Sequence, residues 1–155
     1  MHFTVNGAAY IASGNSSSLL HAGTYATYSG HYHILSVYGI ISDSVGYRYM
    51  ALSLSGVTDT GTVNIGGSAS GGALTILPTI FFLDSTQAGV TRKFLSVFLP
   101  ETTFKGTTTI TKFDLGGGRV SGTFSATLEQ IYPAGVTDTL TVTGGMFTDV
   151  PLTVN

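Results

Sequence analysis

The chain has 155 residues, of which 43% are apolar and only 9% are charged, with six lysines and arginines against eight aspartates and glutamates. That length predicts one domain over residues 1–155, large enough to bury a core without disulfides or a structural metal. The net charge of −2 argues against a nucleic-acid binder, which needs a basic patch. Nine phenylalanines and eight tyrosines argue against intrinsic disorder.

The composition favours strands over helices. The chain holds 21 glycines, 24 threonines and 16 serines; threonine is common in strands, whereas glycine interrupts helices. Cysteine is absent from the sequence, which excludes disulfides, thiol catalysis and cysteine metal sites. No stretch approaches the ~18 consecutive apolar residues of a membrane-spanning helix, so no membrane span is expected.

Nearly every segment alternates side chains at the period of two that indicates strands. The first two, 3–5 and 8–11, predict a hairpin around Asn6-Gly7, a strong turn signal. Further strands are expected, in chain order, over residues 24–27, 31–41, 47–54, 61–65, 73–76, 79–83, 90–99, 107–115, 119–128, 137–143 and 146–154. The glycines at 116–118 and 144–145 are expected to turn the last two hairpins, and brief helical turns are candidates only at 16–21 and 84–88.

About ten strands at a spacing of roughly 8–15 residues, joined by glycine-rich turns, predict an all-β domain. The same pattern argues against alternating strands and helices. We expect an antiparallel β-sandwich or a closed β-barrel.

Three segments carry a family resemblance. Residues 108–114 and 119–126 read TTITKFD and RVSGTFSA, residues 141–151 read TVTGGMFTDVP, and residues 3–10 read FTVNGAAY. They resemble a hairpin, the end and the opening strand of uncharacterised cell-envelope lipoproteins of Bacteroidota. Within this motif we expect Gly122 to relieve crowding or allow a bulge, and Phe113 and Phe124 to face the core.

The resemblance implies a secreted or lipid-anchored β-domain, and it carries no activity over to this chain. In such proteins a signal peptide and a lipidated cysteine precede the domain, and a lipid anchor upstream is therefore a candidate here. No signal peptide is visible after Met1. The chain is either cytosolic or the mature form of an extracellular, cell-surface or periplasmic protein, and its composition and the resemblance favour the second.

Tyrosines gather in one part of the sequence. Six of the eight lie within 25 residues: Tyr25, Tyr28, Tyr32, Tyr38, Tyr47 and Tyr49. Tyrosine rings stack on sugars and their hydroxyls form hydrogen bonds, so this strip is a candidate glycan site, although tryptophan, the strongest platform, is absent. A surface for another protein subunit and plain structural packing are the other two interpretations.

Three histidines suggest a metal. His31 and His33 are two positions apart on an expected strand, so their imidazoles would point to one face. With His21 they form a candidate Zn²⁺ or Cu²⁺ site. The alternative interpretation is a pair of solvated histidines at a strand start, and no other cofactor is indicated.

An enzyme is not expected. The sequence holds no G-x-S-x-G elbow, no H-E-x-x-H pair and no P-loop. The eight carboxylates fall mostly at turns and strand ends, and nothing in their spacing indicates the facing pair that a glycosidase needs.

The low charge is the most unusual property of the sequence. Edge strands are normally guarded by lysine or proline, and this chain has only three lysines and four prolines. The sequence therefore predicts a non-enzymatic, exported surface or envelope domain that assembles with itself or with other protein subunits, through residues 25–49 and strand edges. A carbohydrate-binding module using the tyrosines and a histidine metal-binding domain are the alternatives.

Overall fold

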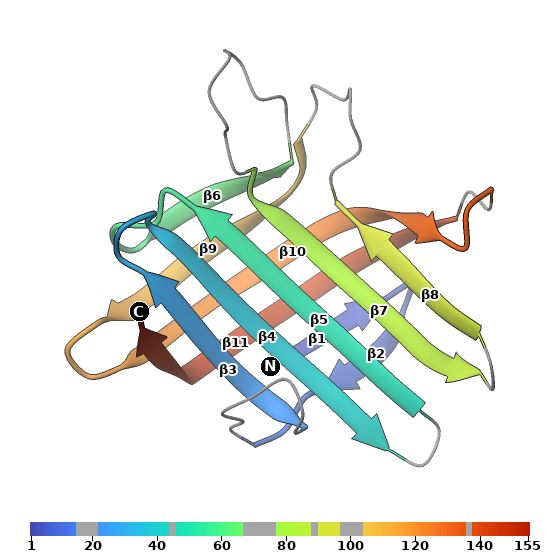
Figure 1. Cartoon of the computed structure of the whole chain (residues 1–155), viewed down its shortest axis with the longest axis horizontal. Coiled ribbons are helices and arrows are strands. Elements are labelled where there is room, and N and C mark those ends of the chain that lie inside the picture. Colours follow the sequence, from blue (N-terminus) through green and yellow to red (C-terminus); the bar gives the residue numbers. More distant parts are fainter. Residues whose placement is uncertain (15–21, 44–45, 67–76, 88–89, 97–103, 136–137) are drawn as a thin grey trace.

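The structure, a computed structural model, describes residues 1–14, 22–43, 46–66, 77–87, 90–96, 104–135 and 138–155 (Figure 1). Those residues contain no helix, and their eleven strands belong to one mixed sheet. The all-β prediction is therefore confirmed. The strands are β1 His2–Val5, β2 Ala8–Ile11, β3 Gly23–Ser29, β4 Ile34–Asp43, β5 Gly46–Ser55, β6 Gly61–Gly66, β7 Thr79–Gln87, β8 Val90–Leu95, β9 Phe104–Asp114, β10 Arg119–Tyr132 and β11 Thr139–Val154.

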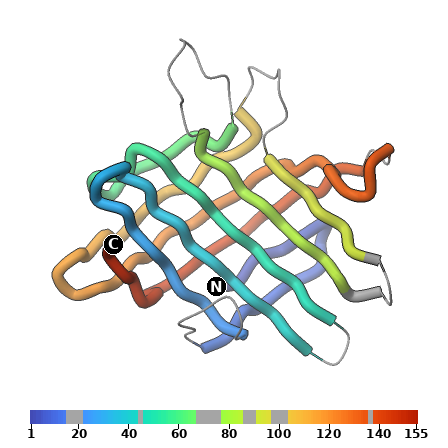
Figure 2. The backbone as a smooth tube through the Cα atoms, in the orientation of Figure 1, coloured from blue at the N-terminus to red at the C-terminus, as the bar shows by residue number. Residues whose placement is uncertain are grey.

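The sheet folds over into two layers whose strands cross at an angle. Figures 1 and 2 show β3, β4, β5, β7 and β8 lying across β11, β10, β9 and β6, with the β1–β2 hairpin beside β11. The strand order is β2-β1-β11-β3-β4-β5-β7-β8-β10-β9-β6, and β10 also pairs with β11. Hydrogen-bonded pairing thus runs from β11 through β3, β4, β5, β7, β8 and β10 and returns to β11.

The core lies between the layers and is rich in phenylalanine. Phe82 and Phe94 come from one layer, and Phe3, Phe124 and Phe147 from the other. Phe3 meets Phe82 edge to face at 6.1 Å between ring centroids. Because each buried aromatic side chain removes a large apolar area from water, this aromatic contact between the layers is a main source of stability.

The prediction of a final hairpin turned by Gly144-Gly145 is wrong. Residues Thr139–Val154 form one continuous strand, β11. Opposite it, Phe124 pairs with Gly145 and Ala126 with Val142, so the glycines lie at a β-bulge. The glycines are needed there because Gly144 has a φ of +58° and a Cβ on Gly145 would lie 2.6 Å from the Phe124 ring.

Two other expectations need correction. The sheet is not purely antiparallel, because the end of β11 pairs in parallel with β3. Residues 84–87 belong to β7 and form no helical turn.

The expected β9–β10 hairpin is confirmed, and so are the strands corresponding to β1 to β8, with ends shifted by a few residues. The expected strand at 73–76 and helical turn at 16–21 lie outside the described residues.

Gly122 sits where the expected bulge was placed, with the register shifting between Ser121 and Gly122. A Cβ there would lie 2.5 Å from the Thr109 carbonyl oxygen and 2.6 Å from the Phe147 ring. The absence of a side chain therefore lets a core ring pack directly onto the β10 backbone. Phe124 is buried and Phe113 packs against the core, as predicted.

We predict that Gly122→Ala lowers the free energy of unfolding by about 2–3 kcal/mol, because the added methyl overpacks the core. Urea unfolding followed by circular dichroism measures the change. Gly116→Ala is the control, since a Cβ at that turn would approach only the Asp114 carboxylate, at 3.8 Å. Equal losses in both variants would contradict the packing explanation.

Thr108 gives a second prediction. It is 0% exposed on the core side of β9, and its hydroxyl has no hydrogen-bond partner within the described chain. Replacing an unpartnered buried hydroxyl with a methyl of similar shape removes a desolvation cost, so Thr108→Val should raise the free energy of unfolding by about 1 kcal/mol. Thr107→Val, on the exposed side, should change it by less than about 0.5 kcal/mol. A destabilised Thr108→Val protein would show that the hydroxyl has a partner in solution.

Candidate binding surfaces

The outer side of β3, β4, β5 and β7 carries no charged side chain along its described length. Residues such as Val37 and Leu52 point into the core, so their neighbours along the strand point outwards. Asp43, Arg48 and Asp84, the charged residues of these strands, all occupy core-facing positions in this alternation. We call the outer side the aromatic face. Its members include Tyr25, Thr27, Ile34, Ser36, Tyr38, Ile40, Tyr47, Tyr49, Ala51, Ser53, Thr79, Phe81 and Leu83.

Three tyrosines on neighbouring strands of this face stack on one another. The ring centroids of Tyr25 and Tyr38 are 4.6 Å apart with an interplanar angle of 21°, and those of Tyr38 and Tyr49 are 6.0 Å apart at 23°. Phe81 continues the row edge-on to Tyr49 at 6.1 Å. Tyr38 therefore has a ring on each of its two faces. We call Tyr25, Tyr38 and Tyr49 the tyrosine stack.

The phenols of Tyr25, Tyr47 and Tyr49 are held in their neutral form. Burial, together with the neighbouring Tyr38 and Tyr47, raises the pKa of Tyr25 to about 12. Burial and the same neighbours also raise the pKa of Tyr49, and burial raises that of Tyr47. Ile40, in register opposite Tyr49, is also only 1% exposed. The tyrosine stack thus has a structural role on the outside of the sheet.

A row of hydroxyl groups runs beside the aromatic row. Thr27 is in register with Ser36, Ser36 with Ser53, and Ser53 with Thr79, which crosses all four strands. Hydroxyls both donate and accept hydrogen bonds. The aromatic face therefore offers ring edges, apolar side chains and neutral hydrogen-bonding groups.

Two of the six predicted tyrosines lie elsewhere. Tyr28 points into the core, is 4% exposed, and donates from its hydroxyl to the Val57 carbonyl at 2.9 Å. Tyr32 lies in the turn between β3 and β4 and is 65% exposed. The structure therefore brings together Tyr25, Tyr38, Tyr47 and Tyr49, and the expectation that residues 25–49 form one tyrosine surface is correct only for these four.

The expected histidine geometry is wrong. His31 and His33 lie in the turn before β4, which begins at Ile34, so they do not share a strand face. His33 has a φ of +51°, and its Nδ1 lies 3.0 Å from the Tyr28 hydroxyl. The His31 ring packs edge-on against Tyr32. His21 lies outside the described residues, within which no group of three metal-binding side chains forms.

An ion cluster on the core-facing side of the same layer was not predicted. Arg92 Nη2 lies 2.7 Å from Asp84 Oδ2, and Arg48 Nη1 lies 3.2 Å from Asp43 Oδ2. Arg48 Nε and Asp84 Oδ1 are 3.7 Å apart and both buried, an electrostatic contact too long for a hydrogen bond. Two cations and two anions leave this cluster neutral. Its members come from β4, β5, β7 and β8, and sequence separation hides their approach.

A groove opens beside the ion cluster, along strand β2. It has a volume of about 430 Å³ and is lined by all four β2 residues together with Ile41, Asp43 and Arg48. The Arg48 guanidinium lies over the Tyr10 ring, 5.4 Å from its centroid. The groove is therefore walled by β2 on one side and by the ends of β4 and β5 on the other.

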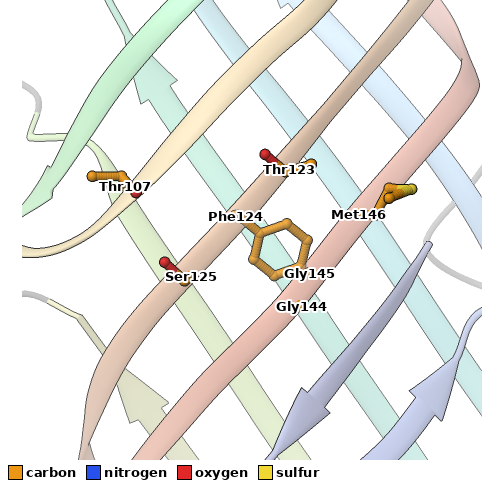
Figure 3. A pocket seen from close by; sticks show the side chains of 7 residues that line it. All are labelled: Thr107, Thr123, Phe124, Ser125, Gly144, Gly145 and Met146. Atoms are coloured by element: carbon orange, nitrogen blue, oxygen red, sulfur yellow. The ribbon is translucent and has the colours of Figure 1, made fainter.

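A smaller depression of about 240 Å³ lies over the bulge of β11 (Figure 3). Thr107, Thr123 and Ser125 supply hydroxyls from β9 and β10, and Met146 lines it from β11. Its lining holds no charged side chain. Gly144 and Gly145 also line it, and because they have no side chains the surface is hollowed here.

Comparison with protein-family models, with curated proteins and with solved structures gives no match to this chain. Among the described residues, no helix has the length and apolar character needed to cross a membrane.

The raised pKa of Tyr25 predicts how stability depends on alkaline pH. Below about pH 10 both the folded and the unfolded chain keep this phenolic proton, so the contribution is fully present. Between about pH 10 and pH 12 the unfolded chain loses the proton first, and the free energy of unfolding falls. Tyrosinate absorbance should show late titration in the folded protein, and Tyr25→Phe should lose less stability over this window. Titration of all eight tyrosines together near pH 10, without loss of stability, would contradict the burial of Tyr25.

Proposed function

We propose that this chain is a non-enzymatic, exported β-domain that assembles with further copies of itself through the aromatic face. The observation that carries the proposal is the absence of charge from that face across four strands. A charged group buried without a partner costs free energy, and here contact between two such faces buries none. Interface cores are typically depleted of charge and enriched in aromatic residues, which matches Tyr38, Tyr49 and Phe81.

A second copy is the occupant that this face fits best. Two aromatic faces packed together present neutral side chains to each other at every position. The hydroxyl row of one copy can bond the hydroxyl row of the other, and the apolar rows exclude water. Such a two-fold contact uses the same patch twice, which is the usual form of a homodimer interface.

The hydrogen-bond circuit supports the closed-barrel alternative over an open sandwich. We propose a barrel flattened into two layers, with the β1–β2 hairpin and β9–β6 as strands added outside the circuit. Closure leaves the edges of β2 and β6 as the only sheet ends among the described strands. The charge-poor surface then needs little edge protection.

The non-enzymatic part of the proposal is supported by the acidic side chains. Each acidic residue in the described part either forms an ion pair or accepts a backbone hydrogen bond at a turn. The ion pairs involve Asp43, Asp84, Glu129 and Asp149, and the turn contacts Asp59, Asp114 and Asp138. None of them presents an uncommitted general acid or base to either groove. Export, and a lipid anchor upstream, are proposed from the composition and from the resemblance to envelope lipoproteins.

The geometry of the tyrosine stack argues against a glycan site on this face. A sugar stacks on the flat side of a ring, and both sides of Tyr38 are covered by its neighbours. The metal alternative is weakened because His31 and His33 do not share a strand face. Both stay testable by ligand-induced shifts of the melting temperature.

A lysine at the centre of the aromatic face tests the assembly proposal. Ser53→Lys places a charge between β4 and β7, and desolvating it should weaken self-association at least tenfold. Light scattering across a concentration range measures the molar mass. The matched control is Ser125→Lys, on the outer side of the other layer, which should associate like the parent. The proposal is overturned if the parent protein stays at 16.1 kDa at all concentrations, or if both variants behave alike.

A further inference from the structure

Strand β2 has one free edge. It pairs with β1 around Asn6-Gly7, with Phe3 opposite Tyr10 and Thr4 opposite Ala9. The Ala12 amide donates to the Met1 carbonyl, which makes positions 1 and 12 a hydrogen-bonded pair. Because hydrogen-bonded and non-hydrogen-bonded pairs alternate, the amide and carbonyl groups of Ala9 and Ile11 point away from β1.

No other strand of the described chain pairs with that edge. The strand has none of the usual protections, since Ala8–Ile11 reads AAYI and holds neither charge nor proline. Its outward side chain Ile11 is 67% exposed, one of the most exposed large apolar residues described. An unguarded edge with an exposed isoleucine is a template for adding a strand.

The groove along β2 provides space on the inner side of that edge. A strand added there would direct alternate side chains inwards, next to Ala8 and Tyr10. The groove's volume of about 430 Å³ falls within the ~300–1,000 Å³ typical of binding sites. Its charged lining residues, Asp43 and Arg48, already pair with each other, so the groove favours an uncharged side chain.

We propose that β2 pairs antiparallel with β2 of a second copy, about a two-fold axis at Tyr10. In this register Ala9 faces the partner's Ile11, and the four free backbone groups of each edge are satisfied. Each added strand directs Tyr10 inwards. This side chain is uncharged, is flanked by alanine and lies next to the groove. The outward side buries Ile11 of both copies against alanine.

A second copy is preferred to an unrelated peptide because β2 itself has the properties that a strand added to the β2 edge needs. Those requirements are an extended backbone, no charge, small outward neighbours for Ile11 and a neutral inward side chain. The other free edge, β6, contrasts with it, because its outward residues Thr62 and Asn64 are polar.

This contact is separate from the aromatic face, and the two together have a geometric consequence. Each is a two-fold contact, and one lies on a sheet face while the other lies on a sheet edge. Two different two-fold interfaces on one chain do not close into a dimer; they build a closed tetramer or larger ring where the two axes meet, and a linear assembly where they do not. With one of them blocked, only dimers remain.

The experiment uses this difference. In the Ser53→Lys protein the aromatic face is blocked, and light scattering should find twice the 16.1 kDa of the chain. Adding Ile11→Lys should reduce the mass to that of the monomer, because it places two charges beside the two-fold axis. Adding Asn64→Lys instead, on the β6 edge, should leave the dimer intact. Circular dichroism and the melting temperature confirm that each variant is folded.

A covalent trap gives a second readout, since the natural chain has no cysteine. The double variant Ala9→Cys with Ile11→Cys should oxidise to a disulfide-linked dimer, whereas Thr62→Cys with Asn64→Cys should remain mostly monomeric. A Ser53→Lys protein that is already monomeric, with no trapped dimer, overturns the β2 contact while leaving the aromatic-face proposal standing. A parent protein that forms only dimers lost on Ile11→Lys, and unaffected by Ser53→Lys, supports β2 and overturns the aromatic face. Equal trapping at both edges also overturns the proposal.

Discussion

The antiparallel ladder between β10 and β11 is the interaction on which the rest of the fold depends. The opposite edge of β11 pairs first with β1 and then with β3, and the opposite edge of β10 pairs with β9 and then with β8. Each of these two long strands therefore belongs to both layers. Their register fixes where Phe124 and Phe147 enter the core, and Gly145 and Gly122 supply the space against which those rings pack.

The same ladder explains how the charges are distributed. Because the layers cross, each strand turns one side to the core and the other to solvent for most of its length. The three charged residues of β4, β5 and β7 all fall on the inner side, where they form the ion cluster with Arg92 at the end of the core. The outer side is left to tyrosine, serine, threonine and apolar residues. The neutral surface therefore results from which alternate positions carry charge as well as from a low total.

The sequence predicts the elements of this fold much better than their arrangement. Alternation and Asn6-Gly7 identify the strands and the first hairpin, because these are local properties. Gly144-Gly145 is misread as a turn, since a bulge and a turn both require glycine at positive φ and only the partner strand separates them. His33 is misread as a strand residue because β-propensity does not register that its left-handed backbone ends the turn.

For the candidate surfaces, alternation correctly places Tyr47 and Tyr49 on one strand face. It cannot place Tyr38 between Tyr25 and Tyr49, because that depends on the registers of three strands. The groove beside β2 and the ion cluster are also invisible to it. Tyr10 meets Arg48 through packing of the β1–β2 hairpin under the other layer, and Arg48 meets Asp84 through the register of β5 with β7.

The charge-free aromatic face also determines how the surrounding solution acts on any contact it makes. Salt weakens associations between opposite charges, over a screening length of about 8 Å at physiological ionic strength. A contact between neutral sheets has no Coulomb attraction to screen, so its strength should be similar at low and at high salt concentration. Salts that are excluded from apolar surfaces, such as sulfate, strengthen the burial of its rings instead. Any contact that this face makes should therefore hold as the salt concentration varies.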